Sequence, residues 1–196
     1  LTMSSLNSKQ LEKFGDQIFA KTEKMSSELF TLTYGSFVIQ LLKDYESASA
    51  VNEQLELVGY KIGSRLIEEY FAKTQFQEAC ASFRETGDAI AKVGLKIFLG
   101  MTASVKNVQK DKSGVRQYSL VFSEYPLMDF VELPQQYSDL WYGNILCGVL
   151  RGCLEVVQFR CTCQFVRCML RGDDANEIVV VLKEVTSEKP LDDDDA

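Results

Sequence analysis

A glycine-containing apolar segment constrains this chain more than any other feature of its sequence. Apolar residues within positions 141–159 recur with helical spacing, and Leu146, Leu150 and Leu154 fall on one side. Three glycines interrupt the same segment, namely Gly143, Gly148 and Gly152. Because a glycine inside a helix costs about 1 kcal/mol relative to alanine, the segment is expected to gain something in return. Close approach of a second backbone is the simpler explanation, and space for a ligand is the alternative.

Several short motifs resemble those of a known family. Positions 144–152 read Asn-Ile-Leu-Cys-Gly-Val-Leu-Arg-Gly. Other matching motifs are Ser-Ser-Glu-Leu-Phe-Thr-Leu-Thr-Tyr-Gly at 26–35, Arg-Leu-Ile-Glu at 65–68, Phe-Arg-Glu-Thr at 83–86 and Asp-Phe-Val-Glu-Leu-Pro at 129–134. Together they resemble the core small subunits of the transport protein particle (TRAPP), the Bet-three family. The resemblance extends over roughly residues 22–190.

The composition narrows the classes of function. The 196 residues are 46% hydrophobic and 25% charged, which is ordinary for one globular domain. No apolar run approaches the ~18 residues of a membrane-spanning helix. The chain has no histidine, which excludes Ser-His-Asp and Cys-His catalysis and every histidine metal site. A net charge of −7 argues against nucleic acid as a partner.

The hydrophobic period predicts helices first and strands later. Besides the glycine-containing segment, helices are predicted at residues 5–21, 26–45, 51–72 and 83–99. Strands are predicted at residues 102–108, 118–122, 159–165 and 178–185, the last as a fully buried strand. The fold class is therefore α+β, a layer of helices packed on a small antiparallel sheet in a single domain. We expect an N-terminal, partly helical extension (1–21), a Bet-three-like domain (22–185) and an acidic tail (186–196).

Cys80 lies just before the predicted helix at 83–99. Ser82 and Glu85 have the spacing of a capping box, and Gly100 is placed to end the helix. Backbone N–H groups and the helix dipole at such a start lower the pKa of a thiol, whereas a neighbouring acid such as Glu78 raises it. Position alone leaves both a reactive and an inert thiol open.

The resemblance assigns Cys80 a role. It stands three residues before the Phe-Arg-Glu-Thr motif, as does the lipid-bearing cysteine of the family. The resemblance implies that Cys80 carries a covalently bound palmitate or similar fatty acyl chain, which enters a hydrophobic channel inside the fold. Gly94, in line with Ile90 and Ile97, is then the position that leaves room in the channel. Close packing against another helix explains Gly94 equally well.

The other cysteines suggest a core and no metal. Cys161 and Cys163 are separated by one residue, which differs from the Cys-x-x-Cys spacing of zinc sites. Alternate residues of a strand share a face, and Phe159 and Phe165 share this one. We therefore expect a small apolar core at these positions.

The resemblance also implies a function. The chain would be a non-catalytic subunit of the TRAPP vesicle-tethering complex, a guanine nucleotide exchange factor for a Rab GTPase in transport from the endoplasmic reticulum to the Golgi. It would be cytoplasmic and peripheral on cis-Golgi and endoplasmic reticulum membranes. Its partners would be other small TRAPP subunits, bound through helices, or a second copy when alone. The rival interpretation is a free-standing carrier of a lipid or other hydrophobic ligand.

The C-terminal tail is the expected contact with the GTPase. In the family this segment reaches toward the nucleotide site of the Rab protein, which corresponds here to Pro190, Leu191, Asp192 and Asp193. Acidic side chains at that site could compete for Mg²⁺ or repel phosphate. Composition alone makes the same segment a solubility tail.

Overall fold

The computed structural model describes residues 6–76, 80–112 and 114–186, and the structural statements below refer to these residues. Its helices are α1 (Ser8–Lys21), α2 (Ser27–Asp44), α3 (Ala48–Thr74), α4 (Phe83–Ala89), the π-helical turn η2 (Ile90–Gly94), α5 (Leu95–Leu99) and α6 (Ile145–Val156). Its strands are β1 (Ser104–Asp111), β2 (Gly114–Phe122), β3 (Phe159–Arg167) and β4 (Asn176–Val185). Short 3₁₀ turns occur at Pro126–Met128, Gln135–Tyr137 and Met169–Arg171. Within the described ranges, no helix combines the length and the apolar composition needed to cross a bilayer.

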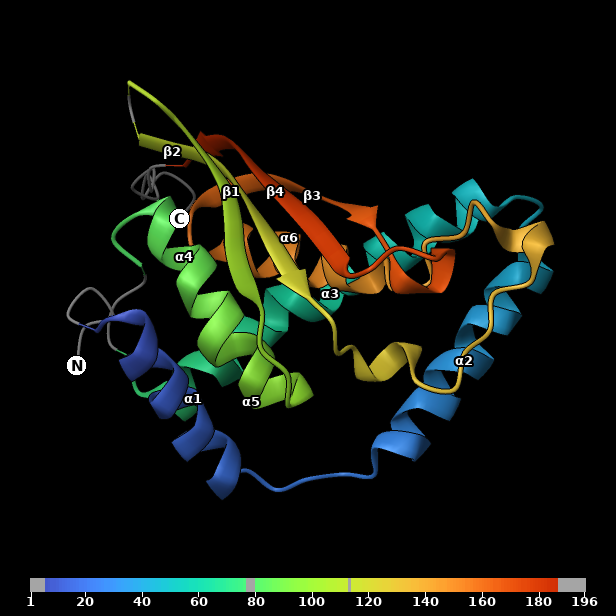
Figure 1. Ribbon diagram of the computed structural model, residues 1–196, viewed down its shortest axis with the longest axis horizontal. Helices are drawn as coiled ribbons and strands as arrows, with labels where there is room; N and C mark the ends of the chain where they lie inside the picture. Colours follow the sequence, from blue (N-terminus) through green and yellow to red (C-terminus); the bar gives the residue numbers. More distant parts are fainter. Residues whose placement is uncertain (1–5, 77–79, 113, 187–196) are drawn as a thin grey trace, which may run out of the picture.

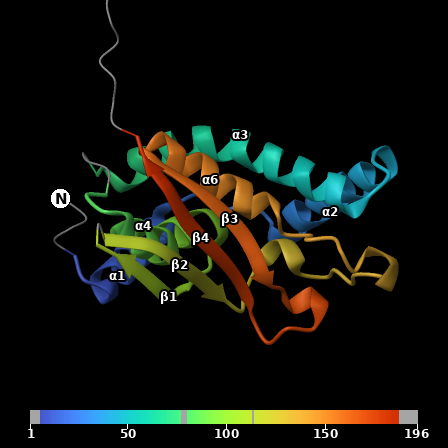
Figure 2. The ribbon, with the colours of Figure 1, turned by 90° about the horizontal axis from the view of Figure 1, so that it is seen from above.

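The four strands form one antiparallel sheet in the order β1-β2-β4-β3. Helix α6 packs on β3, and α3 covers α6 on the side away from the sheet (Figures 1 and 2). The layers are therefore sheet, α6 and α3, as the predicted α+β class requires. Each sheet and helix layer buries one face against the next, which is the usual solution for this class.

The strands follow the predicted pattern of burial only in part, since Ser119 of β2 is buried between Tyr118 and Leu120. In β3, the residues Phe159, Cys161, Cys163 and Phe165 are all buried, which confirms the apolar-core interpretation of the two cysteines. No cluster of acidic and cysteine side chains in the described part of the chain is arranged to hold a metal. The expectation that β4 is buried on both faces is wrong. Alternate residues face the core, but Val179 and Val181 are only half-buried on the open face of the sheet.

The glycines of α6 serve a backbone contact with α3. A Cβ atom placed on Gly148 would lie 2.7 Å from the Tyr60 amide nitrogen. The contact is reciprocal, because a Cβ atom on Gly63 would lie 2.9 Å from the Val149 Cα. Four glycines take part in it: Gly59, Gly63, Gly148 and Gly152. The first explanation, close approach of a second backbone, is confirmed for the two glycines of α6.

The helical region around Gly143 is shorter than predicted. Helix α6 begins only at Ile145, and Gly143 precedes it in a turn. A Cβ atom there would lie 2.6 Å from the Tyr125 ring and 2.7 Å from the terminal methyl of Met128. Gly143 therefore makes room for side chains of the preceding loop, whereas Gly148 and Gly152 make room for a backbone.

The predicted helix at 83–99 exists in three pieces. Ser82 Oγ accepts a hydrogen bond from the Glu85 amide at 3.4 Å, as the capping box requires. The Glu85 carboxylate accepts from the Ala81 amide at 3.1 Å, one residue before the cap. The π-helical turn η2 then separates α4 from α5, and Gly100, with φ of 71°, ends α5 as predicted.

Two hydrophobic clusters lie on opposite sides of this interrupted helix. The main cluster fills the space between the sheet, α6 and α3. We call the smaller one the second cluster. Its buried members are Leu11, Phe76, Ala89, Val93 and Ile97, and its partly buried members are Leu6, Phe14, Ile18, Tyr70, Phe71, Cys80 and Phe98.

Candidate functional site

Cys80 lies at the edge of the second cluster. Its side chain is half-buried and packs against the cluster. Burial raises the pKa of the Cys80 thiol to about 12, and the Glu85 carboxylate adds to the rise. Of the two opposing effects considered from the sequence, the one that raises the pKa of the thiol is the larger. Burial in an apolar cluster outweighs the dipole of a helix that is only seven residues long.

Tyr70 is the polar neighbour of Cys80 in this region. Burial raises the pKa of the Tyr70 phenol, and the nearby Cys80 thiol raises it further. The Tyr70 ring also contacts Phe71, with the two centroids 5.7 Å apart. The thiol is therefore bordered by an aromatic wall from the C-terminal end of α3.

Gly94 differs from the other helical glycines described above. A Cβ atom placed on it would meet nothing closer than the Ala89 carbonyl oxygen at 3.9 Å and the Tyr70 ring at 4.0 Å. Close packing against another helix therefore does not explain this glycine. A small side chain would fit at position 94 in ordinary van der Waals contact with Tyr70, whose phenol has Cys80 as a neighbour.

The structure brings together only part of the predicted channel. Ile97 is buried in the second cluster with Cys80 at its edge. Ile90 is half-buried and packs against the main cluster instead. The π-helical turn explains the difference, because its i→i+5 hydrogen bonds add a residue to the turn and rotate Ile90 relative to Ile97.

Helices α2 and α3 carry a broad exposed apolar surface. Leu29, Leu32 and Ile39 of α2 are 60%, 66% and 56% exposed. On α3, Leu57 and Ile62 are also exposed. Figure 1 shows α2 extending along the side of the molecule opposite α1. We call these five residues the α2–α3 surface.

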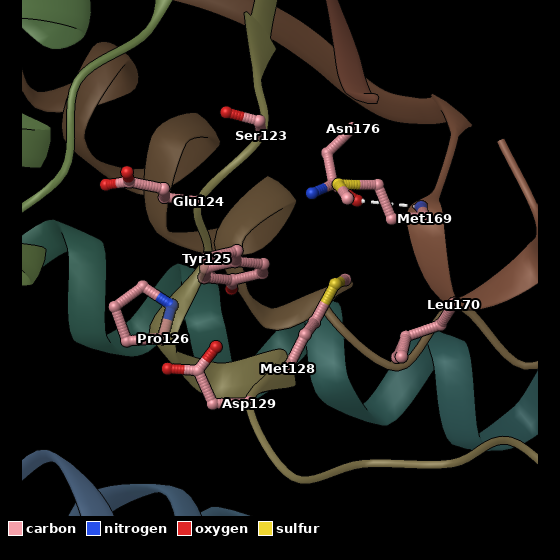
Figure 3. A pocket seen from close by; sticks show the side chains of 9 residues that line it. All are labelled: Ser123, Glu124, Tyr125, Pro126, Met128, Asp129, Met169, Leu170 and Asn176. Atoms are coloured by element: carbon pink, nitrogen blue, oxygen red, sulfur yellow. Dashed lines mark hydrogen bonds between the residues drawn. The ribbon is translucent and has the colours of Figure 1, made fainter. Parts of the chain in front are cut away.

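A surface pocket of about 420 Å³ lies elsewhere (Figure 3). It is lined by Ser123, Glu124, Tyr125, Pro126, Met128, Asp129, Met169, Leu170 and Asn176. Figure 3 shows the Tyr125 ring and the side chains of Met128 and Met169 around it, with two carboxylates at its rim. None of its lining residues belongs to the second cluster, so the pocket and the surroundings of Cys80 are separate features.

Two features were not anticipated from the sequence, and one prediction falls outside the structure. Phe130 is 84% exposed and has a φ of 62°, which is unusual for an aromatic residue. Periodicity gives no signal for it, because it lies in an irregular segment. Helix α1 contributes to the second cluster, although the sequence suggested only an extension. The predicted GTPase-facing residues, Pro190, Leu191, Asp192 and Asp193, lie outside the described residues.

The structure thus combines an α+β fold with a half-buried thiol at the edge of an apolar cluster and with exposed apolar side chains on two helices. Residues 30–181 match the model of the transport protein particle (TRAPP) component family, and the chain belongs to that family.

Relatives cover nearly the whole chain. It is 51% identical to trafficking protein particle complex subunit 3 of Dictyostelium discoideum, over 92% of this chain and 96% of that protein. It is 44% identical to the subunit BET3 of Saccharomyces cerevisiae, over 98% of this chain and all of that protein. These relatives confirm the predicted Bet-three type.

A solved structure also matches. It is the crystal structure of a trafficking protein particle complex subunit 3 from Naegleria fowleri covalently bound to palmitic acid. The TM-score is 0.79 at 50% identity, over 85% of this chain and all of that chain. This match confirms the predicted fold class.

Proposed function

We propose that this chain is a non-catalytic subunit of a TRAPP complex that holds a palmitoyl-like acyl chain on Cys80 and binds other small TRAPP subunits through the α2–α3 surface. The position of Cys80 at the edge of the second cluster is the main evidence for its acylation. Its thiol packs on the second cluster and neighbours Tyr70, against which Gly94 leaves room for a small group. The palmitate of the Naegleria fowleri relative supports the same chemistry.

Acylation would proceed by thioester exchange. An acyl thioester donor would form a new carbonyl–sulfur bond to Cys80 and lose its own, and the Cys80 proton would end on the donor thiol. Because burial raises the pKa of the Cys80 thiol, little thiolate is available to attack the donor at pH 7. The same high pKa makes Cys80 a poor leaving group, so the thioester is durable once formed.

Intact mass spectrometry of protein from a eukaryotic host tests the acyl part. We expect a mass increment the size of a palmitoyl group, which hydroxylamine removes and Cys80→Ser abolishes. Cys153→Ser is the matched control, because burial raises the pKa of that half-buried thiol to about 12 as well. An unmodified wild-type mass, or an increment that survives Cys80→Ser, would refute the assignment.

The α2–α3 surface supports the partner part. Leu29, Leu32 and Ile39 recur on one side of α2 and remain exposed in the isolated chain, which is typical of protein–protein interfaces. Leu32→Asp should abolish co-purification with other small TRAPP subunits without lowering the melting temperature. Val166→Asp is the control, because Val166 is a 48% exposed apolar residue on the sheet, away from α2. Equal co-purification of both variants would place the interface elsewhere.

The proposal also includes a role for the chain in nucleotide exchange by the assembled complex. Within the assembly the chain would contribute to guanine nucleotide exchange on a Rab GTPase, with Pro190 to Asp193 near the nucleotide and the complex peripheral on cis-Golgi and endoplasmic reticulum membranes. Deleting residues 187–196 should slow GDP release by the assembled complex. Unchanged release would leave the tail as a solubility device.

Recovery of the chain alone from cells, with its acyl chain and without unlike subunits, would favour the free-standing carrier.

A further inference from the structure

Helix α1 packs on the same cluster as Cys80, although it lies outside the segment that matches the family model. Leu11 of α1 is only 4% exposed. The Phe14 ring contacts Phe76 from the segment after α3, with centroids 5.1 Å apart. Figure 1 shows α1 running beside α4 and α5. The helix therefore supplies one side of the apolar surroundings of the thiol.

The backbone of α1 touches the π-helical turn directly. A Cβ atom placed on Gly15 would lie 2.5 Å from the Lys92 carbonyl oxygen and 3.4 Å from the Val93 Cα. Both neighbours belong to η2, the turn that ends at Gly94. A side chain at position 15 would thus hold α1 away from the turn.

Two ion pairs join α1 to the same helix. Lys92 pairs with Glu12 at 3.7 Å, and Lys96 pairs with Asp16 at 3.1 Å. The two carboxylates are about half exposed, at 47% and 55%. Exposed pairs of this kind are individually weak and are screened by salt. The attachment therefore combines a close apolar contact with charge pairs that are reversible in water.

We propose that α1 is the outer wall of the acyl site and shields the Cys80 thioester, with Leu11, Phe14 and Ile18 covering the second cluster. This inference rests on the proposed acylation of Cys80. When α1 is held away from η2, the acyl chain loses apolar cover and water-borne nucleophiles reach the thioester. The N-terminal segment is then part of the site and not an appendage to it.

The Gly15→Ala variant tests whether α1 covers the acyl site. Alanine is a better helix former than glycine, so the change strengthens α1 itself and disturbs only its contact with η2. We expect hydroxylamine to release the acyl group from native Gly15→Ala protein about tenfold faster than from wild type, as measured by intact mass. Gln17→Ala, an exposed position on the same helix, is the matched control and should behave as wild type.

A charge swap gives a second test. Asp16→Lys places two cations together and should also accelerate release, whereas Asp16→Lys combined with Lys96→Asp should restore the wild-type rate. Equal release rates in wild type, Gly15→Ala and Asp16→Lys would overturn the role of α1 and leave the acylation of Cys80 intact.

Measurements on unacylated protein distinguish a failure of the proposed acylation from a failure of the proposed role of α1. If wild type carries no acyl chain, the proposed function fails, and the cover is tested by iodoacetamide alkylation of Cys80, read by peptide mass spectrometry. Faster alkylation in Gly15→Ala than in Gln17→Ala supports α1 as the cover of this thiol. Identical rates overturn it.

Discussion

Gly148→Ala is expected to destabilise the protein although alanine is the better helix former. The added Cβ atom would lie 2.7 Å from the Tyr60 amide nitrogen and against the Glu56 carbonyl. Both neighbours are backbone atoms of α3, so no side-chain rotation relieves the overlap. The two helices have to move apart along their contact.

Two opposing contributions determine how much Gly148→Ala changes the free energy of unfolding. The change from glycine to alanine favours the helix by about 1 kcal/mol. Overpacking costs about 1–3 kcal/mol, and an immovable backbone neighbour places this site at the upper end. Separation of the helices by ~0.5–1 Å also removes roughly a quarter to a half of the dispersion energy of the affected contacts. The expected net loss is about 2 kcal/mol, or about 4–8 °C in melting temperature for a chain of this size.

Thermal and urea unfolding measure this loss, best in a Cys80→Ser background where acyl occupancy cannot vary. Gly94→Ala is the matched control, because its Cβ atom would meet nothing closer than 3.9 Å. That variant should keep only the propensity gain and become about 0.5–1 kcal/mol more stable. Changes of the same sign and size in the two variants would refute the steric reasoning.

Three further expectations follow from the structure. The unfolding free energy should fall as pH rises above about 9. Burial raises the pKa of the Cys80 and Cys153 thiols to about 12, so the unfolded chain releases protons that the folded state keeps. An unchanged urea midpoint between about pH 8 and pH 10 under reducing conditions contradicts this. Gly94→Leu should place a large side chain against Tyr70 and abolish acylation, while the helix content by circular dichroism is retained. Full occupancy by intact mass would show that the acyl chain does not pass Gly94. Arg167→Ala should lower the melting temperature, because it removes a 2.8 Å hydrogen bond to the buried Glu177 carboxylate. Hydrogen bonds from Arg167 and its neighbours lower the pKa of Glu177, so the loss should shrink in acid as this carboxylate is protonated, and a pH-independent loss contradicts the pairing.

Local chemistry was readable from the sequence. Ser26 accepts a hydrogen bond from the Leu29 amide at 3.2 Å and caps α2, which begins within one residue of the predicted start. Gly100 ends α5 for an equally local reason, since its backbone is left-handed. Both predictions depend only on residues within one helical turn.

The π-helical turn and the pKa of Cys80 were not readable in this way. Whether the backbone of η2 forms i→i+4 or i→i+5 hydrogen bonds depends on what packs against its two faces. Here α1 packs on one face and the main cluster on the other. The thiol packs against a cluster to which α1, which is distant in sequence, contributes Leu11 and Phe14. The sequence likewise indicated a close approach at Gly148 without indicating that Gly63 belonged to the same contact.

The α3–α6 contact restricts where this chain tolerates changes in length. One inserted residue turns the rest of a helix by about 100°, so every glycine beyond it leaves the contact and a side chain takes its place. Neither helix can compensate by rotamer changes, because the opposing surface is backbone. Insertions and deletions should therefore be confined to the connections, such as residues 123–144 between β2 and α6, while the lengths of α3 and α6 between their glycines stay fixed.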